Sequence, residues 1–162
     1  MQAIVAVYSD WGIGCGGGQP LVISEDRRHF RDVTQGAAVI VGRKTLADFP
    51  GGLPLPGREN IVLTSDRAEI SGATSVHSVQ QAISAAAKFE NVFVIGGESV
   101  YNALFPHLIR IYVTKIEAKP HSDVFFANLD ALSNWKLAEA GEERESGGIK
   151  YSFMVYERVE EI

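Results

Sequence analysis

The chain has 162 residues, of which 46% are hydrophobic and 22% are charged, and its formal net charge at pH 7 is −5. This length suits one domain with a substantial core, and we expect that domain to span residues 1–162. No apolar stretch approaches the ~20 residues that a membrane-spanning helix needs. No block of like charge indicates a surface for nucleic acid.

The cysteine and histidine residues indicate the cellular compartment and whether a metal site is expected. The one cysteine, Cys15, excludes an internal disulfide and is typical of a reducing cytoplasm. The four histidines are scattered without the paired spacing of metal ligands, so no metal site is expected. The N-terminus, MQAIVAVYSD, lacks the basic start and long apolar run of a signal peptide. We therefore expect a cytoplasmic protein, and a monomer, because no apolar surface stripe requires a partner.

Apolar runs alternate with helical patterns over the first two-thirds of the chain. The runs that predict strands lie at 2–8, 37–41, 60–64, 92–95 and 109–117, with a shorter one at 74–76. Helical spacing predicts helices at 24–35, at 43–49, at 78–88 and from 98 until Pro106 stops the pattern. Residues 10–20 contain five glycines and predict a long loop.

The last part of the chain has a different pattern. From about Trp135 to Glu157 it predicts two longer strands joined through ESGG, and the alternation in GIKYSFMVYE predicts an antiparallel edge strand. The sequence therefore predicts a single α/β domain with a mostly parallel central sheet, an antiparallel C-terminal hairpin and flanking helices. A ligand is expected at the carboxyl edge of that sheet, where the turns after Tyr8, at Gly42 and at Gly96 would open.

The segment VIGGESVY places Gly96 and Gly97 between the end of a buried strand and the start of a helix. One explanation is a tight turn that needs positive φ or close packing. The other is a phosphate-bearing ligand pressed against bare backbone, since the N–H groups at a helix N-terminus attract anions. A pair of glycines does not by itself decide between these explanations.

The first predicted helix, SEDRRHFRDVTQG, carries an acid on its apolar side. Ser24 is the expected N-cap, and Asp26 falls on the same face as Phe30 and Val33. An acid in the first turn complements the helix dipole by about 0.3–1 kcal/mol, but an outward acid would do so without the cost of desolvation. An inward carboxylate is suited to a ligand with N–H groups or to a raised pKa.

The motifs converge on one family. WGIG, SEDRRHF, VGRKT, LPLPGR, NIVLTS, VIGGESVY, YVTKIEA and YSFMVYER occur in the order and at the spacing of the dihydrofolate reductase family, which the chain resembles over nearly its whole length. The resemblance implies that NADPH delivers a hydride to C6 of 7,8-dihydrofolate while N5 is protonated. The product would be tetrahydrofolate for one-carbon metabolism, and antifolate inhibitors would be further ligands.

The resemblance also implies a substrate site. Asp26 would bond the amino and ring N–H groups of the pterin and promote protonation of N5 through water. Arg58 would pair with the α-carboxylate of the folate glutamate tail; taken alone, it reads equally well as a surface arginine. The other residues implied in the substrate site are Val5, Ala6, Leu21, Phe30, Arg31, Phe49, Leu55, Ile95, Tyr101 and Thr114. Its apolar members are equally expected as plain core.

For the cofactor, the resemblance implies that Gly96 and Gly97, joined by a cis peptide bond, approach the diphosphate and nicotinamide of NADPH. Ile13 and Gly14 would belong to a loop that closes over the nicotinamide and excludes water. The other residues implied in cofactor binding are Ala6, Gly42, Arg43, Lys44, Thr45, Leu63, Thr64, Ser65, Ile95, Glu98, Ser99, Val100 and Tyr101.

Within that set, Arg43 with Thr64 and Ser65 would hold the 2′-phosphate and favour NADPH over NADH. Without the resemblance, Arg43 and Lys44 read as the solvated start of a helix. Ser99 stands where some family members have an arginine that binds the cofactor, which weakens the expected contact with the 2′-phosphate.

The sequence departs from the family at Leu21, where a tryptophan that helps to order a water near the pterin is usual. Two alternatives therefore stay open. One is a related NADPH reductase that acts on another pterin- or pyrimidine-type ring, which would require neither Asp26 nor Arg58. The other is a non-catalytic pterin-binding homologue, in which Leu21 would mark lost activity.

Overall fold

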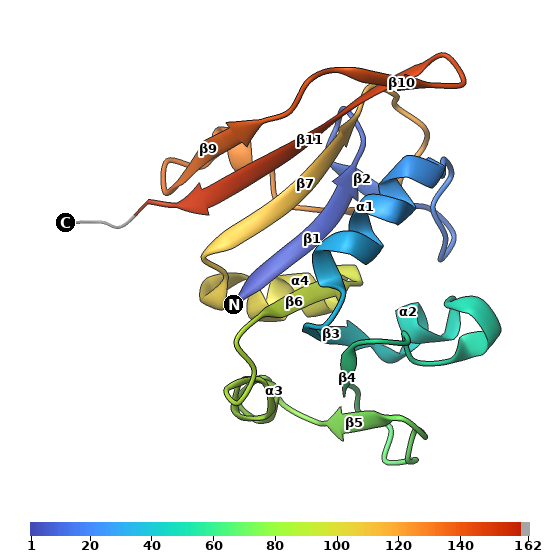
Figure 1. The fold of residues 1–162 in the computed structure, drawn as a ribbon, viewed down its shortest axis with the longest axis vertical. Helices are drawn as coiled ribbons and strands as arrows, with labels where there is room; N and C mark the ends of the chain where they lie inside the picture. The colour runs from blue at the N-terminus through green and yellow to red at the C-terminus, as the bar shows by residue number, and fades with distance from the viewer. Residues whose placement is uncertain (160–162) are drawn as a thin grey trace.

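A computed structural model describes residues 1–159 as an α/β domain built on one large sheet (Figure 1). The strands are β1 (Gln2–Val7), β2 (Gly12–Gly14), β3 (Ala38–Gly42), β4 (Glu59–Leu63), β5 (Ala73–Val76), β6 (Val92–Gly96), β7 (Arg110–Ile116), β8 (Val124–Phe125), β9 (Trp135–Ala140), β10 (Arg144–Ser146) and β11 (Ile149–Arg158). The helices are α1 (Ser24–Thr34), α2 (Arg43–Ala47), α3 (Val79–Ala86) and α4 (Glu98–Leu104). Short 3-10 helices are η1 (Pro50–Gly52), η2 (Phe105–His107) and η3 (Leu129–Ala131).

The strand order in the large sheet is β10-β11-β7-β1-β6-β3-β4-β5, and β9 also pairs with β11. The six strands from β7 to β5 run parallel, whereas β11 is antiparallel to β7, β9 and β10. The predicted fold class is therefore confirmed. Because β1, β3 and β6 are parallel neighbours, the turns that follow them open at the same edge of the sheet.

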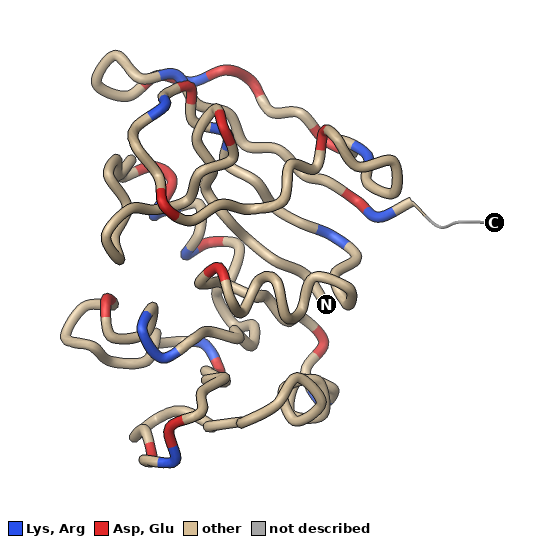
Figure 2. Tube along the Cα trace, turned by 180° about the vertical axis from the view of Figure 1, so that it is seen from behind, with Lys and Arg blue, Asp and Glu red and all other residues tan. Residues whose placement is uncertain are grey.

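Helices cover both faces of the sheet. Phe30 and Val33 of α1 and Leu46 of α2 pack with one set of alternating strand residues, and α3 and α4 pack with the other set. The central strands are apolar throughout because both of their faces are buried: every residue of β6 is buried, as is every residue of β3 before Gly42. Acidic and basic residues are interspersed along the trace (Figure 2). Among residues 1–159, no helix combines the length and apolarity that crossing a membrane requires.

The prediction of β11 as an edge strand is wrong. β11 pairs with β7 on one side and with both β9 and β10 on the other. Alternation reports how a strand's two faces differ in burial, and it carries no information about how many neighbours the strand has. The C-terminal part also has three strands, because the chain leaves β9 at Ala140 and pairs again as β10.

Two smaller expectations also need correction. Ser24 is the first residue of α1, and no side-chain cap precedes it. The carbonyl of Ile23 instead accepts from the N–H groups of Asp26 and Arg27, at 3.0 and 3.2 Å. The loop predicted at 10–20 contains β2, which pairs with β8 as a separate small sheet. Strands of three and two residues are too short to give a periodic signal.

Two adjacent residues just before β7 allow a matched test of the core. Leu108 is fully buried and Ile109 is 61% exposed. We expect Leu108→Ala to lower the free energy of unfolding by about 2–5 kcal/mol through the cavity it leaves. Ile109→Ala should cost about 0.5 kcal/mol or less. Urea unfolding monitored by fluorescence measures both, and equal losses would contradict this account of the core.

Candidate active site

Residues from four elements, α1, β1, β7 and α4, meet around Asp26, close to the carboxyl edge of the sheet. Asp26 lies in the first turn of α1, and its Oδ1 accepts a hydrogen bond of 2.5 Å from Thr114 Oγ1 of β7. Thr114 is the register partner of Ala6 in β1. The hydroxyl of Tyr101, in α4, donates to the carbonyl of Ile4 at 2.7 Å. The predicted inward direction of Asp26 is confirmed.

Burial sets the protonation of Asp26. Removal from water raises the pKa of the Asp26 carboxyl, and the hydrogen bond from Thr114 and the nearby His29 oppose this rise without cancelling it. The charge of Asp26 also raises the pKa of Tyr8 and of Tyr101, though less than burial does. A carboxyl with a raised pKa can bind N–H groups when ionised and can also hold a proton, which are the two properties that acid–base chemistry needs.

The turn after β6 favours glycine at both of its positions. Gly96 has a φ of 127°, which side-chain-bearing residues rarely adopt. A Cβ on Gly97 would lie 3.1 Å from Thr45 Oγ1, and one on Gly42 would lie 3.1 Å from Val100 Cγ2. The turns after β3 and β6 are thus packed against each other. The Gly96–Gly97 peptide bond is cis, as the resemblance implied.

The first loop is held by hydrogen bonds at its middle and just after its C-terminal end. The carbonyl of Gly14 accepts from the N–H of Asp123 at 2.9 Å, and Asp123 Oδ2 accepts from the N–H of Gly16 at 3.0 Å. Further along, the hydroxyl of Tyr8 donates to the carbonyl of Leu21 and accepts from its N–H, at 3.2 and 3.1 Å. Sequence reasoning missed Asp123 and Tyr8 because partners so distant in sequence leave no local signal.

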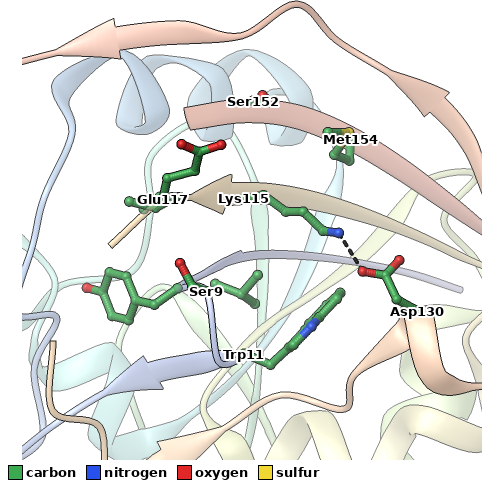
Figure 3. A pocket seen from close by; sticks show the side chains of 10 residues that line it. Ser9, Trp11, Lys115, Glu117, Asp130, Ser152 and Met154 are labelled. Carbon is green, nitrogen blue, oxygen red and sulfur yellow. Dashed lines mark hydrogen bonds and ion pairs between the residues drawn. The ribbon is translucent and has the colours of Figure 1, made fainter. Parts of the chain in front are cut away.

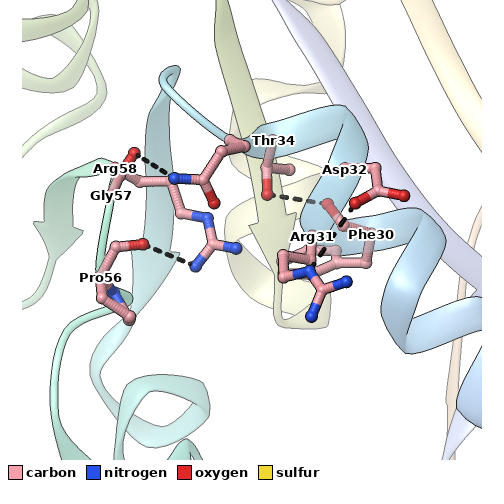
Figure 4. Close-up of polar contacts among 8 residues, drawn as sticks. Phe30, Arg31, Asp32, Thr34, Pro56, Gly57 and Arg58 are labelled. Atoms are coloured by element: carbon pink, nitrogen blue, oxygen red, sulfur yellow. Dashed lines mark hydrogen bonds and ion pairs between the residues drawn. The ribbon is translucent and has the colours of Figure 1, made fainter.

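Two arginines lie on or beside α1, one of which, Arg31, is paired with Asp32 at 3.7 Å. The Arg58 side chain extends toward α1, from which Arg31 projects (Figure 4). Arg58 Nη1 donates to the carbonyl of Pro56 at 3.0 Å, while its buried Nε has no hydrogen-bond partner within residues 1–159. Burial and then the charge of Arg31 lower the pKa of Arg58, although an arginine stays charged at neutral pH. A buried N–H without a partner suits a carboxylate-bearing ligand.

Comparison with known proteins identifies the group to which the chain belongs. A family model described as dihydrofolate reductase matches residues 1–158. The chain belongs to the dihydrofolate reductase family. It is 38% identical over 158 residues to the dihydrofolate reductase of Bacillus subtilis, covering 96% of this chain and 92% of the relative. It is 35% identical over 156 residues to that of Neisseria gonorrhoeae, covering 94% of each chain.

A solved structure extends the family match to three dimensions. Dihydrofolate reductase from Enterococcus faecalis, complexed with NADP(H) and RAB-propyl, superimposes with a TM-score of 0.86 at 31% sequence identity. The match covers 98% of this chain and 96% of that one. The similarity therefore includes the C-terminal strands as well as the parallel sheet.

Most of the apolar residues that the family resemblance implies for the substrate site fall into two apolar clusters. Ile95 is buried and Phe30, Phe49 and Leu55 are half-buried in the cluster beneath α1 and α2. Ala6 and Leu21 pack in the next cluster, with Ile23 and Tyr151. The side chain of Val5 points to the opposite face of the sheet, so that only its backbone could meet a ligand beside Asp26.

Most residues implied for the cofactor line the two glycine turns. Thr45 lies against Gly96 and Gly97, while Lys44 and Ser99 are exposed. Arg43 forms a 3.5 Å ion pair with Asp66, whose N–H donates to Thr64 Oγ1 at 3.0 Å. Leu63 ends β4, and Ser65 follows Thr64 in an exposed position.

Other implied residues occupy the neighbouring loop and helix. Ile13 packs against the core cluster that contains Trp11 and Val100. Glu98 Oε2 accepts from the N–H of Phe125 at 2.7 Å. Within residues 1–159, no group of three His, Cys, Asp or Glu side chains has the geometry of a metal site.

The bond between Thr114 and Asp26 can be tested directly. A hydrogen bond to the ionised carboxylate lowers its pKa, so we expect Thr114→Val to raise the pKa of Asp26 further. Carbon-detected NMR titration of the Asp26 carboxyl measures this change. Thr34→Val is the control: Thr34 is equally buried, but its hydroxyl donates to the carbonyl of Phe30 on the far end of α1. An equal change in both variants would contradict a direct effect.

Proposed function

We propose that the protein reduces 7,8-dihydrofolate to 5,6,7,8-tetrahydrofolate with NADPH and so supplies one-carbon metabolism. The half-buried carboxyl of Asp26, bonded to Thr114 and close to the turn of Gly96 and Gly97, carries this proposal. A reductase that acted on a different ring would need no acid at this position. The extent of the family match supports the same reaction.

The carboxylate of Asp26 would recognise the pterin ring through paired hydrogen bonds. Thr114 bonds to Oδ1 only, so Oδ2 and the remaining lone pair of Oδ1 can accept from the amino and ring N–H groups of the pterin. Such charge-assisted bonds to two donors are strong and directional in a site with little water. With a raised pKa, Asp26 would also stabilise the proton that N5 receives through a water.

The arrangement of the glycine turns fits NADPH. The missing Cβ atoms of Gly96, Gly97 and Gly42 face Thr45, Tyr101 and Val100, so these glycines let the two turns pack closely at the carboxyl edge of the sheet, where we propose that NADPH binds. Arg43 and Lys44 offer exposed cations to phosphate groups beside that edge. When bound, NADPH supplies the hydride.

Specificity for the phosphorylated cofactor would come from the end of β4. Arg43, Thr64 and Ser65 lie within one small region there, and we assign to them the 2′-phosphate. The ion pair of Arg43 with Asp66 is 3.5 Å long and about half-exposed, so it contributes little and can exchange for a phosphate.

The remaining assigned residues shape the site and exclude water. Phe30, Phe49 and Leu55 would contact the pterin and aminobenzoyl groups. Ile13 and Gly14, in the strand paired with β8, would cover the nicotinamide. Leu21 has no donor in its side chain, so its backbone, held by the Tyr8 hydroxyl, is the part that could order water.

Further properties belong to the same proposal. We infer a cytoplasmic monomer whose ligands include dihydrofolate and antifolate inhibitors. The single cysteine and the curated bacterial relatives support the location. Light scattering after size-exclusion chromatography measures the oligomeric state.

The deciding experiment follows the absorbance of NADPH after addition of dihydrofolate. A steady fall in absorbance that requires both compounds supports the proposed reaction. No fall with dihydrofolate, but a fall with another pterin or pyrimidine, would favour the related reductase. Binding of dihydrofolate without any turnover would favour the non-catalytic homologue.

The role of Asp26 predicts a pH-dependent loss. We expect Asp26→Asn to lower the turnover rate at neutral pH by roughly 10²–10⁴-fold, as is usual on loss of an acid–base group. The loss should shrink in acid, where the substrate arrives already protonated. Asp32→Asn, an exposed acid on the same helix, is the control. A turnover rate that Asp26→Asn leaves unchanged at neutral pH would refute the assigned role.

The same substitution should stabilise the fold. The pKa of Asp26 is higher in the folded chain than in the unfolded chain. At a pH between these two pKa values, the folded state therefore binds more protons than the unfolded state does. The free energy of unfolding therefore falls as pH rises over that window, and the penalty persists above it. Asp26→Asn should remove the penalty, giving a higher unfolding midpoint at neutral pH than the unchanged chain.

The role of Arg58 predicts a loss confined to one part of the substrate. A hydrogen-bonded charge pair contributes about 1.5–3 kcal/mol, so Arg58→Leu should raise KM for dihydrofolate by roughly 10- to 100-fold. A substrate that lacks the glutamate tail should bind equally to both proteins. Arg67→Leu, an exposed arginine elsewhere, is the control. Equal losses with both substrates would place Arg58 outside the tail-binding site.

A further inference from the structure

The base of the first loop, on the face of the sheet opposite Asp26, has a feature that the proposed chemistry does not use. Trp11 has a φ of 63° and is the one non-glycine residue with positive φ among residues 1–159. A bulky residue in this region costs about 1–3 kcal/mol and keeps the conformation only where its surroundings impose it. The contacts of Trp11 therefore show what fixes the loop.

Backbone bonds hold Trp11 from both sides. Its N–H donates to the carbonyl of Tyr8 and its carbonyl accepts from the N–H of Phe126, each at 2.9 Å. The next residue, Gly12, is packed so closely that a Cβ there would overlap the side chain of Ser122. These contacts therefore restrict the backbone conformation of the residues that follow β1.

The indole ring is held by two side chains. It is 7% exposed, and the Nζ of Lys115 lies 5.2 Å from its ring centroid (Figure 3). Its edge meets the ring of Tyr156, with centroids 6.1 Å apart and an angle of 70°. An ammonium group over an indole and an edge-to-face aromatic pair are both attractive and depend on orientation.

One carboxylate fixes both of those partners. Asp130 Oδ2 accepts from Lys115 Nζ at 2.6 Å, and Asp130 Oδ1 accepts from the Tyr156 hydroxyl at 2.7 Å. Lys115 belongs to β7, Tyr156 to β11 and Asp130 to η3, so three elements converge on the ring.

A cavity of about 200 Å³ adjoins this cluster, lined by Trp11, Lys115 and Asp130 together with Ser9, Ser152 and Met154. The indole thus has open space beside it. On that side, the contacts with Lys115 and Tyr156 add orientation to the packing of the ring in the core.

We propose that Trp11, held by Lys115, Asp130 and Tyr156, is a positioning residue for hydride transfer. Only one residue separates it from Ile13, and the loop that it anchors continues to Gly14. The cluster thereby fixes the part of the loop assigned to the nicotinamide, so this inference rests on the proposed function. A displacement of about 1 Å in such a part can slow a reaction by roughly 10²-fold.

The first test needs no activity. Trp11→Leu removes the ring, and Trp135→Leu is the matched control because Trp135 is equally buried but contacts Phe105 and Arg158 instead. In the ligand-free protein we expect the amides of Ile13 and Gly14 to exchange at least about tenfold faster in Trp11→Leu. They should be unchanged relative to the other amides in Trp135→Leu. Equal acceleration in both variants would overturn the proposal.

The second test measures the reaction in a single turnover with NADPH and its deuterated form. Trp11→Leu should slow the isotope-sensitive step by about tenfold or more, while the Kd for dihydrofolate changes by less than about twofold. Trp11→Phe should recover most of the rate because it restores an aromatic ring. An unchanged rate in Trp11→Leu, or a rate that falls equally in Trp135→Leu, would reject a positioning role.

A third variant covers the case in which Trp11→Leu fails to fold. Asp130→Asn keeps the size of a half-exposed side chain but weakens its hold on Lys115 and Tyr156. As expected for Trp11→Leu, it should accelerate amide exchange at Ile13 and slow hydride transfer. No effect on either rate would overturn the proposal. If the unchanged chain shows no NADPH oxidation with dihydrofolate, the proposed function fails, whereas the exchange test still decides whether the cluster anchors the loop.

Discussion

The half-buried carboxyl of Asp26 is the constraint on which the site depends. A carboxylate removed from water is costly, and here one hydroxyl, that of Thr114, lies close enough to offset part of the cost. That contact requires α1 to start beside the carboxyl end of β7. The arrangement of helix and sheet and the chemistry of the acid are therefore linked. Hydrogen bonds from a ligand with N–H groups can offset the part of the desolvation cost that Thr114 leaves.

In the proposed function, the glycine turns would place NADPH beside the pterin. Gly96 contacts Tyr101, whose hydroxyl bonds to the carbonyl of Ile4 in β1. Asp26 is near enough to influence the pKa of the same tyrosine. Tyr101 thus lies near both the glycine turn and the acid. Such proximity is what a direct transfer between two bound molecules needs.

Much of this fold could be predicted from sequence because apolar residues follow clear patterns along its central strands and helices. The apolar runs gave β3 and β6 within a residue or two, and the inward position of Asp26 followed from the helical spacing of Phe30. What could not be predicted depends on contacts between distant residues. The pairing of β2 with β8 and the bond from Thr114 to Asp26, 88 positions apart, have no local signature.

The site showed the same division. Motif resemblance supplied the candidate residues, including both glycines, but it gave no indication that the side chain of Val5 points away from Asp26. The hydroxyl of Tyr8 was also missed, because its partner is the backbone of Leu21 and any residue there would serve. Side-chain direction at these positions depends on strand register, which a one-residue shift would reverse.

The position of β1 in the middle of the sheet has a consequence for synthesis. β1 is synthesised before both of its partners, β6 and β7, and β7 is complete only at Ile116. Until then the nascent chain carries an apolar strand with an open edge, which is a template for association with other chains. Any fragment that ends before β7 should therefore aggregate or engage chaperones, even though it contains Asp26 and both glycine turns.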